Sequence, residues 1–192
     1  MRIVGIILAG GQGRRMGREK ALVRLAGEPL IARVLARLAP QVEAVAISAN
    51  GDPGRFGLGL PVLPDRAGES GLGPMAGIRA GLDWAAGMGA EALVSVATDT
   101  PFLPEDLVAR LAATGGPAHA QSFGRDHYTA ALWRVADRPR IDALFAADER
   151  RMRAYLAGAV AVPFDTTPDP FANLNTPEDL ARAEDRLRQD AP

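Results

Sequence analysis

The first twenty residues join a short apolar run to a glycine-rich basic segment, and this junction constrains the fold more than any other feature. The apolar run covers residues 3–8, and Gly10, Gly11, Gly13 and Gly17 follow it. A continuous apolar run of this length, bounded by glycines, is typical of a buried strand. Glycines lack a Cβ atom, so successive backbone N–H groups can turn toward one point, and such a concavity suits phosphate oxygens. The segment therefore predicts a phosphate-binding loop after a buried strand.

The charges beside this loop favour a triphosphate as its ligand. Arg14, Arg15 and Lys20 would each add a charge-assisted hydrogen bond to a phosphate, whereas a neutral ligand would gain little from three crowded cations. Of the 22 basic side chains in the chain, 21 are arginine, and Lys20 is the one lysine. A general drift toward arginine would also leave a lysine somewhere by chance. Its position at the end of the loop favours a need for a compact ammonium there.

Two familiar phosphate motifs do not fit the segment. A Walker loop has Lys-Ser or Lys-Thr directly after its last glycine, whereas Gly17 is followed by Arg18 and Glu19 before Lys20. A dinucleotide fingerprint requires the next strand to end in an acidic residue, and that strand ends in Ala49-Asn50. The sequence therefore disfavours both a P-loop enzyme and a nicotinamide enzyme.

Apolar periodicity along the chain predicts alternating helices and strands. Strands are expected at 42–48, 60–63 and 91–97, and helices at 30–38, at 75–86 and from Pro104. Strands that alternate with helices form a parallel sheet covered on both faces. Two further strands, at 118–121 and 128–133, would form an antiparallel edge, and a strand is expected before Thr176, which would cap a last helix. The predicted fold is a three-layer α/β/α domain that spans residues 1–192.

Asp99 follows the predicted strand 91–97, at the end of the strand where open α/β sheets bind ligands. An aspartate at this place could also cap the following helix. That helix already has Pro104 at its first turn and two acids, Glu105 and Asp106, beside it. One carboxylate together with nucleotide phosphates and water is a common way to hold Mg²⁺. We therefore expect Asp99 to be a magnesium ligand.

Composition excludes several classes of function. The chain has no cysteine, which rules out disulfides, thiolate metal sites and cysteine nucleophiles. A net charge of −1 gives no general attraction to nucleic acid. No apolar run approaches the length of a membrane span, and the run at 3–8 is too short for a secretory signal. We expect a cytoplasmic protein that binds neither nucleic acid nor a membrane.

The pattern L-A-G-G-x-x-x-R-M-G-x-x-K is present as Leu8 to Gly11, Arg15 to Gly17, and Lys20. It resembles the signature of nucleotidyltransferases, and the wording Leu-Ala-Gly-Gly is most similar to the molybdenum cofactor guanylyltransferases. This resemblance implies the fold of nucleotide-diphospho-sugar transferases and transfer of GMP from GTP, with Mg²⁺, to molybdopterin that carries molybdenum. It also implies a monomer whose macromolecular contacts are transient ones with other proteins of cofactor biosynthesis.

The resemblance further assigns roles to individual residues. The backbone of Leu8, Ala9, Gly10 and Gly11 would hold the nucleotide, Arg15 and Lys20 its phosphates, and Asp99 the Mg²⁺. Asn50 and Asp65 would contact the guanosine, and Gly73-Pro74 would complete the nucleotide pocket. Asn173 and Asn175 would lie toward the molybdopterin. Ser48 replaces an asparagine that some family members carry two residues before Asn50, which leaves a secondary contact open.

Other features keep more than one interpretation. Arg150 and Arg151 read most simply as a solvated face of a helix that begins at Glu149, and a contact with the phosphate of the acceptor is the alternative. His119 and His127 are expected to be structural. A relative that transfers CMP, or one that activates a sugar phosphate, would use the same loop, and a nucleotide-sensing protein would bind GTP without turnover.

Overall fold

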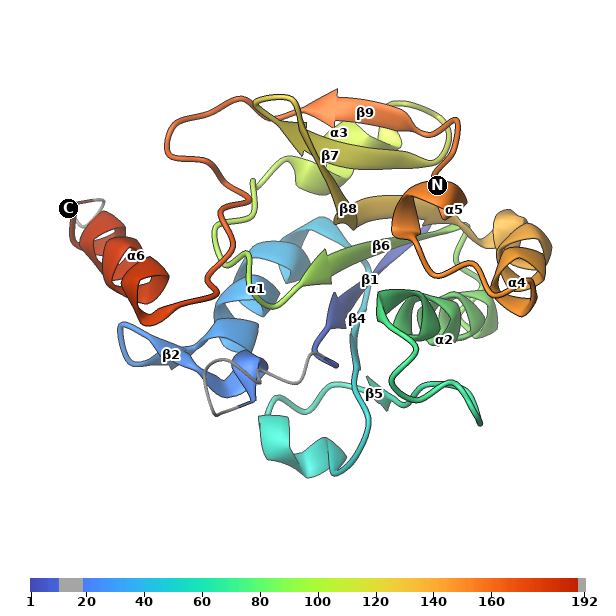
Figure 1. Ribbon diagram of the computed structural model, residues 1–192, viewed down its shortest axis with the longest axis horizontal. Helices are drawn as coiled ribbons and strands as arrows, with labels where there is room; N and C mark the ends of the chain where they lie inside the picture. The colour runs from blue at the N-terminus through green and yellow to red at the C-terminus, as the bar shows by residue number, and fades with distance from the viewer. Residues whose placement is uncertain (11–18, 190–192) are drawn as a thin grey trace.

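The computed structural model describes residues 1–10 and 19–189, which form an α/β domain around a seven-stranded sheet (Figure 1). The strands lie in the order β5-β4-β1-β6-β8-β7-β9. Their bounds are β1 Ile3–Leu8, β4 Val45–Ser48, β5 Val62–Leu63, β6 Ala92–Ala97, β7 Ala118–Ser122, β8 Arg125–Arg134 and β9 Val160–Pro163. A two-stranded hairpin, β2 Arg24–Leu25 and β3 Glu28–Pro29, lies outside this sheet. The helices are α1 Leu30–Leu38, α2 Pro74–Gly87, α3 Leu107–Ala112, α4 Arg138–Ala146, α5 Met152–Tyr155 and α6 Pro177–Gln189.

The sheet is mostly parallel, as the sequence predicts. Strands β5, β4, β1 and β6 run parallel to one another. Strand β8 pairs antiparallel with both β6 and β7. Strand β9 then pairs parallel with β7 and forms the edge of the sheet. The predicted antiparallel pair therefore exists, but it lies inside the sheet rather than at its edge.

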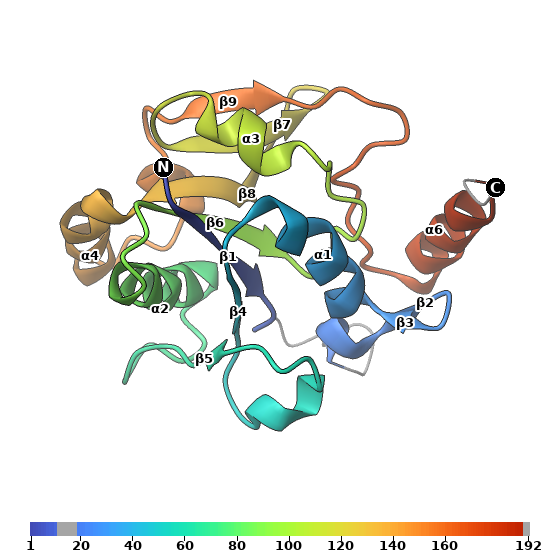
Figure 2. The same ribbon diagram turned by 180° about the vertical axis from the view of Figure 1, so that it is seen from behind.

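Helices cover both faces of the sheet because side chains alternate along its buried strands. In β1, Ile7 packs into the core that contains α1 and α3, whereas Val4 and Ile6 pack into the core that contains α2 and α4. Figures 1 and 2 show these two helix layers from opposite sides. A third, small core joins the β2–β3 hairpin to α6 through Leu25, Leu30 and Ala183.

Helix α2 lies very close to the sheet at two glycines. A Cβ atom on Gly77 would lie 2.1 Å from Ser48 Oγ, and one on Gly81 would lie 2.6 Å from Ile6 Cδ1. The two glycines are one helical turn apart, so they lie on the same face of α2. They let the first turns of α2 approach the ends of β1 and β4, where the site forms.

Three local predictions are wrong. Helix α3 begins at Leu107, so Pro104 precedes the helix and does not lie in its first turn. Residues 171–176 form no strand, because Leu174 N–H donates to the Asp99 carbonyl and the N–H groups of Asn175 and Thr176 donate to the Asp179 carboxylate. Helix α5 begins at Met152 and not at Glu149. The Glu149 carboxylate accepts hydrogen bonds from the N–H groups of the next two residues and so holds an extended segment there. The predicted cap of α6 is confirmed, since Thr176 Oγ1 accepts from Asp179 N–H at 3.1 Å.

Candidate active site

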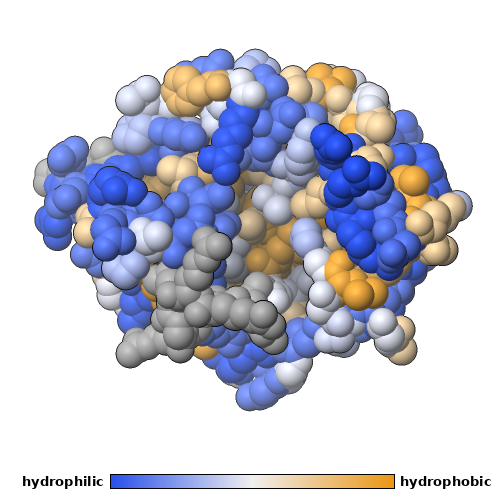
Figure 3. Space-filling model, viewed as in Figure 1, coloured by the Kyte–Doolittle hydropathy of each residue, from blue (hydrophilic) through white to orange (hydrophobic). Residues whose placement is uncertain are grey.

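The candidate site lies at the carboxyl ends of four neighbouring parallel strands. Gly10 follows β1, Asn50 follows β4, Asp65 follows β5 and Asp99 follows β6. Because these strands are parallel and adjacent, all four residues emerge at the same edge of the sheet. The face of the molecule on which β1 and β6 end is hollowed at its centre, between hydrophilic walls (Figure 3).

Lys20 and Asp99 form the first polar cluster of this edge. Lys20 Nζ donates to Asp99 Oδ2 at 2.9 Å, and the side chains are 18% and 22% exposed, so both can reach a ligand. Lys20 Nζ also donates to Asn175 Oδ1. The ammonium has three donors, and two of them bind these described residues. The structure thus brings together three residues that the sequence analysis assigned to phosphate, metal and acceptor.

Asn50 and Asp65 form the second cluster. Asn50 Nδ2 donates to Asp65 Oδ2 at 2.7 Å, and Asp65 N–H donates back to Asn50 Oδ1 at 2.9 Å. A third contact, from Asn50 Nδ2 to Ser70 Oγ at 3.3 Å, brings in the segment that precedes α2. The reciprocal pair of hydrogen bonds fixes the orientation of the Asn50 amide, and Asn50 is exposed while Asp65 is partly exposed. The two residues that the resemblance assigns to the guanosine therefore lie together in the structure.

Backbone groups complete the edge. Gly73 has φ of +90°, a conformation that favours glycine, and it precedes Pro74 at the first position of α2. The first turn of α2 has no acidic side chain, so its positive end is available to an anion. Gly10 is exposed, and a Cβ atom added to it would meet no atom of residues 1–10 or 19–189 within 4 Å. The predicted loop thus starts at the surface of the site.

The donor set suits a hard cation that a ligand helps to bind. Asp99 Oδ2 accepts a hydrogen bond from Lys20, whereas no residue that the structure describes forms a hydrogen bond or ion pair with Oδ1. Among residues 1–10 and 19–189, no three histidine or acidic side chains gather into a metal cage. A magnesium ion at Asp99 would therefore take most of its oxygen ligands from phosphates and water, as Mg²⁺ commonly does.

The remaining predicted residues lie elsewhere or outside the described ranges. Gly11 and Arg15 belong to residues 11–18, which the structure does not describe. Arg150 donates to the Phe145 carbonyl at 2.8 Å and pairs with Asp148, and Arg151 pairs with Glu149 at 2.7 Å. The two arginines therefore make local contacts in this structure. Asn173 lies half-buried in the irregular segment before α6, and its predicted role stays a prediction.

Both histidines make structural contacts. His119 Nε2 bonds to Asp126 at 3.0 Å, and the ring lies against Tyr128. His127 Nε2 bonds to Ser122 Oγ at 2.7 Å, and its ring stacks on Phe171. Burial lowers the pKa of His127 below its ordinary value. Neither ring reaches the Lys20–Asp99 cluster.

Two residues near the site are missing from the sequence predictions. Ser70 touches Asn50, and Arg79 on α2 is 8% exposed. Arg79 lies four residues after the buried Met75, so it occupies the apolar face of the helix. An arginine at such a position is the signal that could have indicated a buried ion pair.

Comparisons with known proteins decide the family. Residues 5–162 match the model of the MobA-like NTP transferase domain. The molybdenum cofactor guanylyltransferase of Rhodobacter capsulatus is 89% identical to this chain over 192 residues, which is the full length of both. The chain belongs to the molybdenum cofactor guanylyltransferase family. It is a nucleotidyltransferase, as the motif around Leu8 and Lys20 predicts.

Solved structures of lower identity show the same fold. Molybdopterin-guanine dinucleotide biosynthesis protein A of Archaeoglobus fulgidus aligns with a TM-score of 0.74 at 24% identity, covering 97% of this chain and 99% of that one. The 4-diphosphocytidyl-2C-methyl-D-erythritol synthase of Anaerococcus prevotii aligns with a TM-score of 0.76 at 12% identity, covering 97% and 96%. The three-layer fold of this guanylyltransferase family member is thus shared with a protein named for a cytidyl product. Within the described residues, no helix is long and apolar enough to cross a membrane.

Proposed function

We propose that this protein transfers GMP from GTP, in the presence of Mg²⁺, to molybdopterin that carries molybdenum. The single observation that carries this proposal is the Lys20–Asp99 ion pair beside the loop at Gly10, in a chain 89% identical to a molybdenum cofactor guanylyltransferase. In the reaction, an oxygen of the acceptor's terminal phosphate forms a bond to the α-phosphorus of GTP. The bond from that phosphorus to the bridging oxygen breaks, and pyrophosphate leaves with its electron pair.

The residues of the site would act by positioning and by neutralising charge. Lys20 would direct its third donor at the phosphates while Asp99 and Asn175 hold its ammonium in place. The nucleophile is a phosphate oxygen that is already ionised, so no side chain has to remove a proton. This agrees with the structural contacts of both histidines.

Asp99 would hold the Mg²⁺. When bound, this ion would neutralise charge on the phosphate oxygens and orient them. Asp99 could hold the ion and keep its bond to Lys20, because that bond uses only Oδ2 of the carboxylate. Arg15, which lies outside the described residues, would place a further positive charge beside the phosphates.

Specificity for guanine would come from Asn50, Asp65 and Gly10. Asn50 and Asp65 offer an amide and a carboxylate to the guanosine, and Gly10 leaves the loop backbone open to the base. Relatives that transfer CMP have alanine at the position of Gly10, by the resemblance of the motif. We expect Gly10→Ala to fold normally, because its Cβ atom would meet no atom of the described residues within 4 Å, and to shift the preference from GTP toward CTP.

Pyrophosphate release tests turnover against simple binding. With Mg²⁺ and GTP, release should depend on molybdenum-loaded molybdopterin, and the product should be the guanine dinucleotide. A protein that binds GTP but releases no pyrophosphate with this acceptor would be a nucleotide-sensing protein instead. Release with a sugar 1-phosphate in place of molybdopterin would indicate an enzyme that activates sugars. We further propose that the enzyme is a cytoplasmic monomer.

A further inference from the structure

The loop of residues 64–73 joins β5 to α2, and its polar side chains point in two directions. Asp65 and Ser70 contact the Asn50 amide. Their chain neighbours Arg66 and Glu69 contact the helices on the other side. A backbone hydrogen bond from Glu69 N–H to the Arg66 carbonyl, at 2.9 Å, closes the turn between them. The residues that hold the loop are therefore next in sequence to those that face the nucleotide site.

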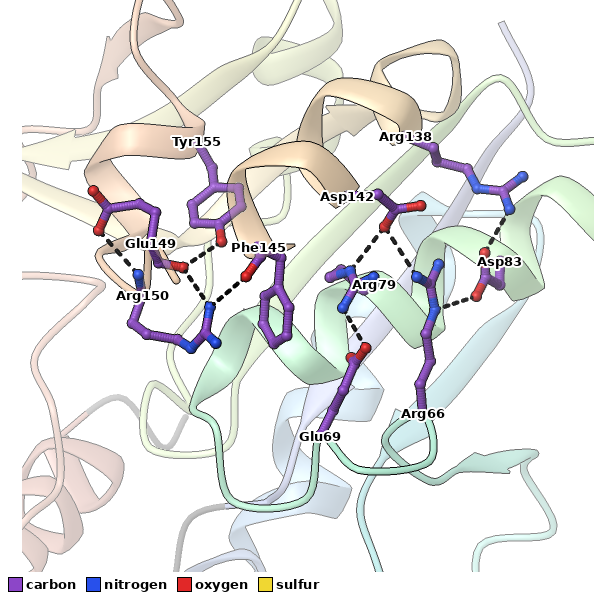
Figure 4. A network of polar contacts seen from close by, with 10 residues as sticks. All are labelled: Arg66, Glu69, Arg79, Asp83, Arg138, Asp142, Phe145, Glu149, Arg150 and Tyr155. Carbon is purple, nitrogen blue, oxygen red and sulfur yellow. Dashed lines mark hydrogen bonds and ion pairs between the residues drawn. The ribbon is translucent and has the colours of Figure 1, made fainter. Parts of the chain in front are cut away.

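Two arginines hold the loop through a shared carboxylate (Figure 4). Arg66 donates to Asp83 of α2 at 2.7 Å and to Asp142 of α4 at 3.0 Å. Arg79 of α2 donates from Nη1 to Glu69 and from Nε to Asp142 Oδ1 at 2.8 Å. Burial opposes ionisation of Asp142, but the bond from Arg79 and the charges of both arginines outweigh it and lower its pKa. Three elements, the loop, α2 and α4, thus meet at one group of charges.

The Glu69–Arg79 pair is the most buried of these ion pairs. Its side chains are 15% and 9% exposed, and the Arg79 guanidinium lies 4.2 Å from the centre of the Phe145 ring. Removing one partner of such a pair leaves an uncompensated charge, whereas an apolar pair of the same size would be easier to bury. The pair therefore contributes more to the position of its segments than to overall stability.

The loop has little else to hold it. None of its residues is fully buried, and its one large apolar side chain, Leu72, is 37% exposed. Gly68 and Gly71 have φ of +81° and Gly73 has φ of +90°. Without apolar anchors, a loop with three such glycines has many accessible conformations. Apart from the bonds that Asn50 makes with Asp65 and Ser70, the polar contacts of Arg66 and Glu69 are thus the main anchors of the loop.

We propose that Glu69, Arg66 and Arg79 are positioning residues that set the affinity for the nucleotide by holding the 64–73 loop against α2 and α4. This inference rests on the proposed function, in which Asn50 and Asp65 contact the guanosine. If the loop keeps its binding geometry in only a fraction of molecules, the apparent affinity falls to that fraction of its intrinsic value. The chemical step at Lys20 and Asp99 is unaffected once the nucleotide is bound.

Glu69→Gln tests this directly, because the amide has the size of the carboxylate but no charge. The KM for GTP, and the Kd for GTP with Mg²⁺ measured by calorimetry, should rise about tenfold if the loop is correctly placed in one molecule in ten. The kcat at saturating GTP should stay within about twofold of the wild-type value, since the reacting groups keep their places. Arg79→Lys should act in the same direction, since a single ammonium cannot bridge Glu69 and Asp142 as the guanidinium does. The double variant should lose less GTP affinity than the sum of the two single losses, because both changes act on the Glu69–Arg79 contact.

Arg138→Gln is the matched control. Arg138 Nη2 pairs with Asp83 at 2.6 Å in the same group of charges, but it does not touch the loop. Its KM for GTP should stay at the wild-type value, whatever happens to the melting temperature. A Glu69→Gln protein with a lower melting temperature and an unchanged KM would overturn the inference, because the pair would then be structural alone. A wild-type protein that neither binds nor uses GTP would instead refute the proposed function.

Discussion

The variant Lys20→Arg tests whether this position needs a compact ammonium group or only a positive charge. The Lys20 ammonium bridges Asp99 Oδ2, at 2.9 Å, and Asn175 Oδ1, and it keeps one donor for a phosphate. The side chains of the ion pair are 18% and 22% exposed, so there is little room for a larger head group. A planar guanidinium can keep the pair with Asp99, but it cannot direct its donors to three separate acceptors in the same way.

The expected loss follows from one contact to a charged group. Such a hydrogen bond contributes about 1.5–3 kcal/mol, so kcat/KM with GTP should fall by about 10- to 150-fold. The melting temperature should change by no more than about 2 °C, because the charge is kept and about 1 kcal/mol corresponds to a shift of roughly 2–4 °C in a protein of this size.

The assay is pyrophosphate release at several GTP concentrations, with thermal unfolding measured on the same samples. Arg33→Lys is the control, because Arg33 also forms a partly buried ion pair, with Glu28 at 3.4 Å, and its other bond goes to the Leu25 carbonyl rather than to a residue of the site. Its kcat/KM should match that of the wild type. Wild-type kcat/KM in Lys20→Arg would refute the reasoning, since charge alone would then suffice at this position.

Asp99→Asn should raise the Mg²⁺ concentration needed for half-maximal rate and lower turnover by roughly tenfold or more, since it also weakens a charged contact with Lys20. An unchanged dependence of the rate on Mg²⁺ would show that the carboxylate is structural. Gly77→Ala should destabilise the fold by about 1–3 kcal/mol, because its Cβ atom would lie 2.1 Å from Ser48 Oγ, and Ser48→Ala should recover part of the loss. An unchanged melting temperature would contradict the close approach of α2. Burial lowers the pKa of His127 in the folded protein, so as the pH falls His127 is protonated in the unfolded chain before it is protonated in the folded one. The stability from keeping His127 neutral is present above about pH 6.5 and is lost as the pH falls toward the lowered pKa. His127→Gln should therefore flatten the decline of the melting temperature between pH 7.5 and 5.5, and an identical decline would contradict this assignment.

The sequence predicts the ends of the parallel strands well because they combine two strong signals. Continuous apolar runs mark β1 and β6, and glycine or polar residues directly after them mark the edge where ligands bind. Gly10 and Asp99 could therefore be placed at strand ends from the residues alone, whereas Asn50 and Asp65 were assigned to the nucleotide by the resemblance. Strand β9 has no comparable signal, since it has four residues, of which Val160 is exposed and Pro163 is the last.

Contacts between distant segments could not be predicted in the same way. The bond from Lys20 to Asn175 joins residues 155 positions apart, and it depends on how the segment before α6 returns to β6. That segment also defeated the prediction of a strand, because its N–H groups bind Asp99 and Asp179 rather than a neighbouring strand. The place of Arg79 on the apolar face of α2 could have indicated a buried ion pair, but its partners Glu69 and Asp142 lie on other segments, which only packing brings together.

Pyrophosphate release from GTP, CTP and ATP, each with Mg²⁺ and molybdenum-loaded molybdopterin, tests the central claim most directly. A site that leaves a buried polar group unpaired with the wrong base loses about 1–3 kcal/mol for each such group. We therefore predict a clear preference for GTP in kcat/KM, of roughly tenfold or more over both other nucleotides, if at least one such group is involved. A wild-type enzyme that prefers CTP would contradict the assignment of guanylyl transfer to this site.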